Sequence, residues 1–134
     1  MVSVPQAVLV GFVVAGVFAA VAEPGRSDSM IASTAEAEVC ATDGLPGSAY
    51  SRAHRVVKRS GRQGYEHDHI VPLCLGGADN EANLQWQPIN EALEKDRLER
   101  AACIAVCRNH TVGLTEAQSW FLRDWRKEMW RLGR

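Results

Sequence analysis

The stretch from Tyr65 to Pro88 places the tightest limits on what this 134-residue chain can form. Residues 65–75 have strand character, but Pro72 lacks a backbone N–H and restricts that strand to an edge or a bend. The loop signal of residues 76–80 (Gly-Gly-Ala-Asp-Asn) separates it from a short second strand expected over residues 83–87. The pattern therefore predicts two short strands joined by a loop.

Two helices are expected after these strands. Pro88 suits the first position of a helix, which the spacing of apolar residues extends to about Asn109. Thr115 with Gln118 forms a capping-box pattern at the start of a last helix. We expect the apolar residues of that helix to be core, namely Trp120, Phe121, Trp125, Met129 and Leu132. Strands followed by helices predict a small α+β domain.

The first 22 residues contain no Lys, Arg, Asp or Glu, and their apolar run ends in Ala20-Val21-Ala22. That ending is the small-x-small pattern of a signal-peptidase site, although the usual positively charged start is missing. Residues 1–22 are therefore either a cleaved signal peptide or an uncleaved anchor, and both imply an exported protein, secreted, periplasmic or held at the membrane. A transient membrane contact through this leader is expected. Residues 23–43 are predicted to be a flexible linker and residues 44–134 the folded domain.

The chain has four cysteines, an even number in a sequence that looks exported. Two disulfides are expected, and three pairings are possible in principle. Cys103 and Cys107 lie four apart on one predicted helix, where a bond between them would be awkward. The other two cysteines are Cys40 and Cys74.

The formal net charge is −1, but basic residues are concentrated in one segment. Residues 44–65 carry five of them and no acidic residue. Such a cluster is either a phosphate-binding surface or a solvated basic face. Its members are Arg52, Arg55, Lys58, Arg59 and Arg62.

Residues His67, Asp68, His69 and Asn83 combine side chains suited to cleaving a phosphodiester bond. A neutral histidine such as His69 can take a proton from water near pH 7. A carboxylate such as Asp68 can hold a cation that stabilises the negative charge of the transition state. An amide such as Asn83 can orient the imidazole by a hydrogen bond. We expect an exposed His69 with these groups around it.

The run His67-Asp68-His69-Ile70-Val71-Pro72-Leu73, with Gly76-Gly77 and Asn83-Leu84, resembles the signature of the HNH (ββα-metal) endonucleases. The later part of the chain, from Lys95-Asp96 to Asp124-Trp125, is similar to small exported HNH-like proteins of bacteria and phages. The resemblance implies a ββα-metal core with an additional C-terminal helix, stapled by disulfides. It also implies the pairing Cys40–Cys107 and Cys74–Cys103.

Carried over residue by residue, the resemblance makes Asp68 a metal ligand, His69 the general base and Asn83 the residue that orients it. His67 would be a further ligand, a substrate contact or an exposed neighbour. The helix departs from the family pattern, because Ala92 occupies the usual position of a His or Asn ligand. Asp96, one turn further along the same face, is expected to replace that ligand. The competing interpretation pairs Asp96 with Arg100.

The implied activity is hydrolysis of phosphodiester bonds in DNA, with RNA as the alternative substrate, and the basic cluster would bind the phosphates. One divalent cation is expected, and mixed oxygen and imidazole ligands suit Mg²⁺, Mn²⁺ or Zn²⁺. The alternative function is a non-catalytic exported binding protein that keeps the scaffold while its site has decayed. Ala92 is the observation that favours this alternative.

Overall fold

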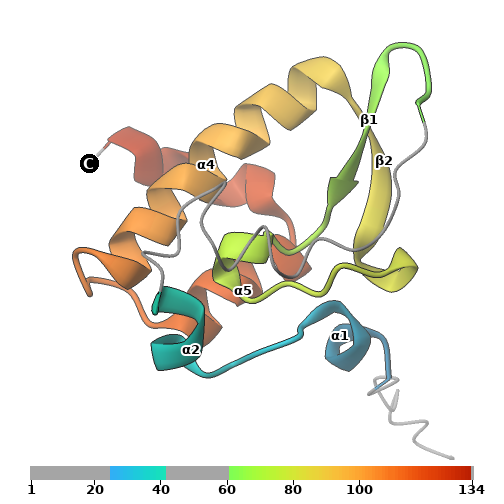
Figure 1. The fold of residues 1–134 in the computed structure, drawn as a ribbon. Helices are drawn as coiled ribbons and strands as arrows, with labels where there is room; N and C mark the ends of the chain where they lie inside the picture. Colours follow the sequence, from blue (N-terminus) through green and yellow to red (C-terminus); the bar gives the residue numbers. More distant parts are fainter. Residues whose placement is uncertain (1–24, 42–60, 134) are drawn as a thin grey trace, which may run out of the picture.

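A computed structural model describes residues 25–41 and 61–133 (Figure 1). The predicted leader and four of the five basic-cluster residues (Arg52, Arg55, Lys58 and Arg59) lie outside the described residues. Within the described part, no helix has both the length and the apolar character needed to cross a membrane. The fold is a small α+β arrangement of an antiparallel hairpin, a long helix and a further C-terminal helix.

The hairpin consists of β1 (Tyr65–His69) and β2 (Leu84–Pro88). His67 lies opposite Trp86, and His69 lies opposite Leu84. Because side chains alternate along a strand, these residues share one face and Asp68 lies on the other. The first strand is shorter than predicted.

β1 ends at His69, whereas the sequence predicted strand character as far as Leu75. The chain turns at Pro72 into the 3₁₀ helix η1 (Leu73–Leu75), because proline has no N–H for a strand ladder. A second 3₁₀ turn, η2 (Glu81–Asn83), leads directly into β2. The loop between the strands is thus two tight turns around the glycine pair.

Gly76 and Gly77 are required by close backbone contacts. Gly76 has a φ of 76°, and a Cβ there would lie 2.4 Å from the carbonyl oxygen of Ser33. A Cβ on Gly77 would lie 2.0 Å from the carbonyl oxygen of Val71. Because these glycines have no side chains, the N-terminal segment can hydrogen-bond to the loop. Ala32 N donates to Gly76 O at 2.8 Å.

Helix α4 (Ile89–Cys107) follows the second strand, as predicted, but it begins one residue after the predicted Pro88, which is its N-cap, and ends two residues before Asn109. Figure 1 shows α4 running from the end of β2 across the molecule, above α5. Two apolar residues near its start, Ile89 and Leu93, are exposed. The buried face instead comprises Ala92, Lys95, Leu98, Ala102, Cys103 and Val106.

The C-terminal region forms two elements where the sequence predicted one. Helix α5 (Leu114–Leu122) ends before the 3₁₀ helix η3 (Trp125–Gly133). The N-cap of α5 is Gly113 and no side chain caps it, so the predicted Thr115–Gln118 box is absent. Gln118 is buried and donates to Ser33 O and Leu75 O, both at 2.8 Å, which joins α5 to the loop. The predicted core residues Trp120, Phe121 and Trp125 are buried.

Residues 25–41 differ from the predicted flexible linker. They contain α1 (Gly25–Met30) and α2 (Glu36–Cys40), which lie against the rest of the fold (Figure 1). Met30 and Val39 are part of the hydrophobic core, and Ala78 N donates to Met30 O at 2.8 Å. Met30 and Val39 anchor this segment together with its backbone hydrogen bonds and the Cys40–Cys107 disulfide, which are contacts that overall composition does not reveal.

Two disulfides join α4 to α2 and to η1. The bonds are Cys40–Cys107 and Cys74–Cys103, which confirms the pairing implied by the resemblance. The first links residues 67 apart in sequence and ties α2 to the end of α4. Each bond is expected to stabilise the fold by about 2–4 kcal/mol. Disulfides persist in oxidising compartments, which supports a location outside the cytoplasm.

Candidate active site

His69, at the end of β1, forms a short contact with a loop carboxylate. Its Nε2 lies 2.6 Å from Asp79 Oδ1, and the side chains of both residues are buried. A carboxylate at this distance favours the proton on Nε2, which places the ring's lone pair on Nδ1. The imidazole is therefore held in the tautomer that a general base needs.

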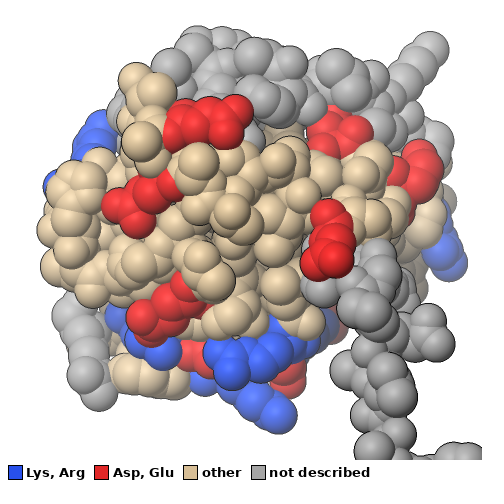
Figure 2. Space-filling model, turned by 90° about the horizontal axis from the view of Figure 1, so that it is seen from below, with Lys and Arg blue, Asp and Glu red and all other residues tan. Residues whose placement is uncertain are grey.

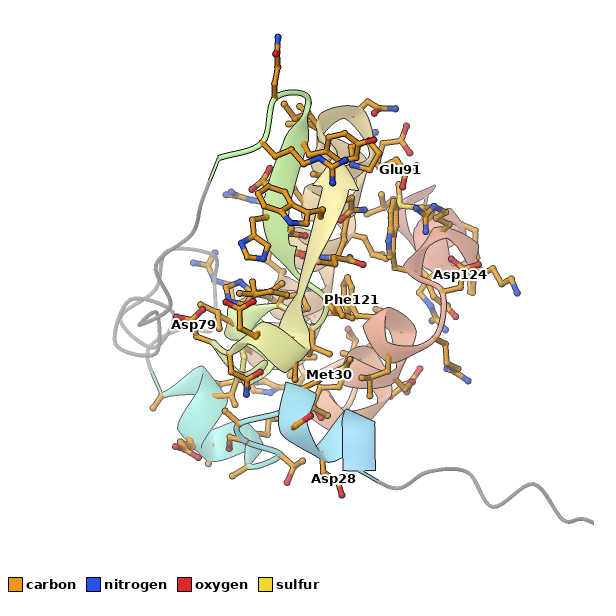
Figure 3. All side chains as sticks on the ribbon, turned by 90° about the vertical axis from the view of Figure 1, so that its right-hand side faces the viewer. Asp28, Met30, Asp79, Glu91, Phe121 and Asp124 are labelled. Atoms are coloured by element: carbon orange, nitrogen blue, oxygen red, sulfur yellow. A yellow bond between two sulfur atoms is a disulfide. The ribbon has the colours of Figure 1, made fainter. Side chains whose placement is uncertain are left out.

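The structure differs from the prediction in the exposure of His69 and in its partner, Asp79. His69 is only 4% exposed, whereas the sequence predicted an exposed imidazole. Asp79 was missed because the segment 76–80 indicated only a loop. Figure 3 shows Asp79 on one side of the hairpin and Asp124 on the other. The His69 ring lies on the same side of the hairpin as Asp79, which its Nε2 contacts.

Asn83 has a different partner from the one predicted. Its amide N–H groups donate to Val71 O (2.9 Å) and Ala78 O (2.8 Å), and its Oδ1 accepts from Val71 N (2.9 Å). Both donors of the amide are thus used by backbone carbonyls. Asn83 holds the loop that carries Asp79 through these hydrogen bonds, so Asn83 can influence His69 only indirectly.

Asp68 points to the other side of the hairpin, where Lys95 from α4 meets it. Lys95 Nζ donates to Asp68 Oδ2 at 2.7 Å, to His69 O at 2.6 Å and to Glu99. Lys95 is fully buried, with 0% exposure. The sequence does not predict the burial of this residue, because lysine is among the side chains most rarely buried. One ammonium group thus ties the end of β1 to the helix.

The charges around Lys95 perturb one another. Burial alone would lower the pKa of Lys95, but the charges of Glu99 and Asp68 outweigh it and raise that pKa. Burial raises the pKa of Glu99 to about 7, and repulsion from Asp68 adds to the rise while Lys95 opposes it. Burial and then repulsion from Asp68 also raise the pKa of Asp96. Asp68 and Glu99 therefore share a single ammonium group, and Asp96 lies close enough for its pKa to be influenced by Asp68 and Lys95.

Glu99 should make the fold less stable as the pH rises. A carboxyl whose pKa is raised in the folded protein binds its proton more tightly there than in the unfolded chain. Its contribution to the free energy of unfolding is therefore lost as the pH rises from about 4.5 to 7. We expect the free energy of unfolding of Glu99→Gln to change less than that of wild type between pH 5 and pH 8. Urea unfolding at both pH values measures this. Equal losses in the two proteins would contradict a protonated Glu99.

The charge of Asp68 influences the pKa of Asp96, but Asp96 forms no ion pair with Arg100. The two are described residues, and no ion pair joins them. Ala92, the position of the missing ligand, is fully buried, so a larger side chain there would overpack the core. Within residues 25–41 and 61–133, no three His, Cys, Asp or Glu side chains are arranged to hold a metal ion. A cation at this place would have two carboxylates, Asp68 and Asp96, from the protein.

His67 is separated from these carboxylates by the strand itself. It lies on the opposite face from Asp68 and stacks on Trp86, with ring centroids 4.6 Å apart and planes 13° apart. The structure therefore does not bring His67 together with Asp68 and Asp96 as a ligand set.

The lower face of the molecule carries charges of both signs. Figure 2 shows Asp and Glu scattered across this face, with Lys and Arg gathered mainly along one edge. Two arginines of η3 pair with acids: Arg126 with Glu91 of α4, and Arg131 with Glu128. Among the described residues of this face, the Lys and Arg side chains form no continuous basic surface for a phosphate backbone (Figure 2).

Comparison with protein-family models, with curated proteins and with solved structures found no match for this chain. The function is therefore inferred from the residues of the site itself.

Proposed function

We propose that this protein is a metal-dependent endonuclease that hydrolyses phosphodiester bonds of DNA, with RNA as the alternative substrate. The contact between His69 and Asp79 supports this proposal most directly. It is a buried imidazole–carboxylate pair one residue from Asp68, at the end of a strand in a hairpin followed by a helix. The HNH resemblance of the sequence points to the same activity.

His69 would act as the general base. With the proton of Nε2 directed at Asp79, Nδ1 can take a proton from an attacking water molecule. The imidazole then becomes positively charged, and the Asp79 carboxylate stabilises that charge. Asn83 would keep the loop of Asp79 in place through its three backbone hydrogen bonds.

Asp68 and Asp96 would hold one divalent cation. Repulsion from Asp68 contributes to the raised pKa of Asp96, and a bound cation would relieve that repulsion beyond what Lys95 already does. Two carboxylates completed by water suit a hard cation, so Mg²⁺ or Mn²⁺ fits this donor set better than Zn²⁺. When bound, the cation would stabilise negative charge on the phosphate and on the leaving oxygen.

Replacing Asp96 should weaken metal activation. In Asp96→Ala we expect the half-activating metal concentration for cleavage to rise by roughly tenfold, with saturating metal restoring part of the rate. Titration of Mg²⁺ or Mn²⁺ in a cleavage assay measures the shift. Glu94→Ala is the matched control, because Glu94 is an exposed acid on the same helix. Identical titrations for both variants would show that Asp96 is not a ligand.

The proposal itself is tested by nicking of supercoiled plasmid with and without EDTA. Cleavage by the purified protein that stops in EDTA and returns with added Mg²⁺ or Mn²⁺ would support it. Cleavage that continues in EDTA would contradict the metal requirement. Absence of cleavage under every metal condition would contradict the nuclease function.

A second candidate function is a non-catalytic binding protein on the same scaffold. Two observations favour it: Lys95 already pairs with Asp68, and Ala92 offers no ligand. An inactive protein that still binds DNA in EDTA would support this candidate.

A further inference from the structure

The hairpin face that carries His69 also carries a cluster of aromatic side chains and one arginine. Tyr65 is 39% exposed and Trp86 36% exposed, both large for aromatic residues of a small domain. The Arg62 guanidinium carbon lies 4.3 Å from the centroid of the Tyr65 ring and 6.0 Å from that of Trp86. His67 stacks on Trp86. We refer to Arg62, Tyr65, His67 and Trp86 as the hairpin aromatic face.

These side chains contribute little to the core. None of the four belongs to the hydrophobic core cluster, and they contact one another across the two strands. His67 Nδ1 is buried yet has no hydrogen-bond partner among the described residues. The face thus combines flat, polarisable rings, the positive charge of Arg62 and the unsatisfied His67 Nδ1. These are properties of a binding surface.

The chemistry of this face matches an unpaired nucleotide. Bases stack on aromatic side chains, and an arginine beside them can contact a phosphate or the base. A base in a duplex is already stacked and paired, so its flat faces are not accessible to Trp86. The positive charge of Arg62 complements the negative backbone of the strand.

We propose that the hairpin aromatic face binds single-stranded nucleic acid by base stacking and directs it toward His69. This inference builds on the proposed nuclease function and specifies its substrate as unpaired strands. His67 and His69 are two residues apart on one face of β1, which separates them by about 7 Å along the strand. A strand stacked on Trp86 would therefore lie close to the imidazole proposed to act as the base.

The test measures binding without cleavage. The full chain is titrated, in EDTA, into a fluorescein-labelled single-stranded oligodeoxynucleotide and into the matching duplex, with anisotropy as the readout. We expect tighter binding of the single strand. Trp86→Ala should weaken that binding by about tenfold, whereas Trp86→Phe should retain most of it because a stacking ring remains. Trp130→Ala is the matched control, because Trp130 is an exposed tryptophan on η3.

The outcomes separate this inference from the nuclease proposal. Stacking-dependent binding by a protein that cleaves nothing would support the inference and contradict the enzyme. Equal affinities of Trp86→Ala and Trp130→Ala would overturn the inference, as would tighter binding of the duplex that does not depend on Trp86. Binding of a neutral chitooligosaccharide that depends on Trp86, with no binding of the oligonucleotide, would also overturn it, because sugars too can stack on aromatic rings.

Discussion

Replacement of His69 should reduce cleavage by a factor of roughly 10²–10⁴, the usual contribution of a general base. We expect this for both His69→Ala and His69→Gln, measured as initial rates of plasmid nicking at saturating metal. The glutamine variant is the more informative, because its amide can still donate a hydrogen bond to Asp79. It removes the titrating nitrogen while filling much of the same buried volume.

Burial of His69 makes a stability control necessary. His69→Ala takes a hydrogen-bond partner from the buried carboxylate of Asp79, so some loss of stability is expected. Urea unfolding separates that loss from the loss of rate. His110→Ala is the matched control, because His110 is an exposed histidine far from the hairpin in sequence. A His69→Gln protein that cleaves at the wild-type rate would show that another group is the base.

The sequence predicted the order of the elements better than their limits. Pro72, Gly76-Gly77 and Pro88 act through backbone geometry, so they locate the turn, the loop and the start of α4. Such residues carry their structural meaning locally. The end of α5 has no comparable marker in the sequence, and the single predicted helix is two elements in the structure.

The site was predicted less completely, because its contacts join distant parts of the chain. Asp79 meets His69 across ten residues of loop, and Lys95 meets Asp68 across 27 residues. Nothing in the local sequence distinguishes Lys95 from Lys127, which is exposed. The resemblance suggested the residue types at the site, but it assigned Asn83 a contact with His69 that the structure gives to Asp79.

Lys95 should be the most costly side chain of the site to remove in terms of stability. It is fully buried, and its ammonium group is shared by Asp68, Glu99 and the carbonyl oxygen of His69. A buried ion pair is not in itself strongly stabilising, because desolvation offsets much of the attraction. Removing one partner is different, because the remaining charges stay buried and unpaired. We expect Lys95→Met to lower the free energy of unfolding by about 3–5 kcal/mol at pH 8.

The pH dependence of that loss identifies its cause. At pH 5 Glu99 carries a proton in the folded protein, because its pKa is raised to about 7. Lys95→Met then leaves fewer unpaired charges, so we expect a smaller loss of unfolding free energy at pH 5 than at pH 8. Urea unfolding of wild type and Lys95→Met at both pH values measures the difference. Lys127→Met, at an exposed position, should change stability by less than about 0.5 kcal/mol at either pH. An equal loss in Lys95→Met at pH 5 and pH 8 would mean that packing of the lysine chain, rather than its charge, stabilises the junction of β1 and α4.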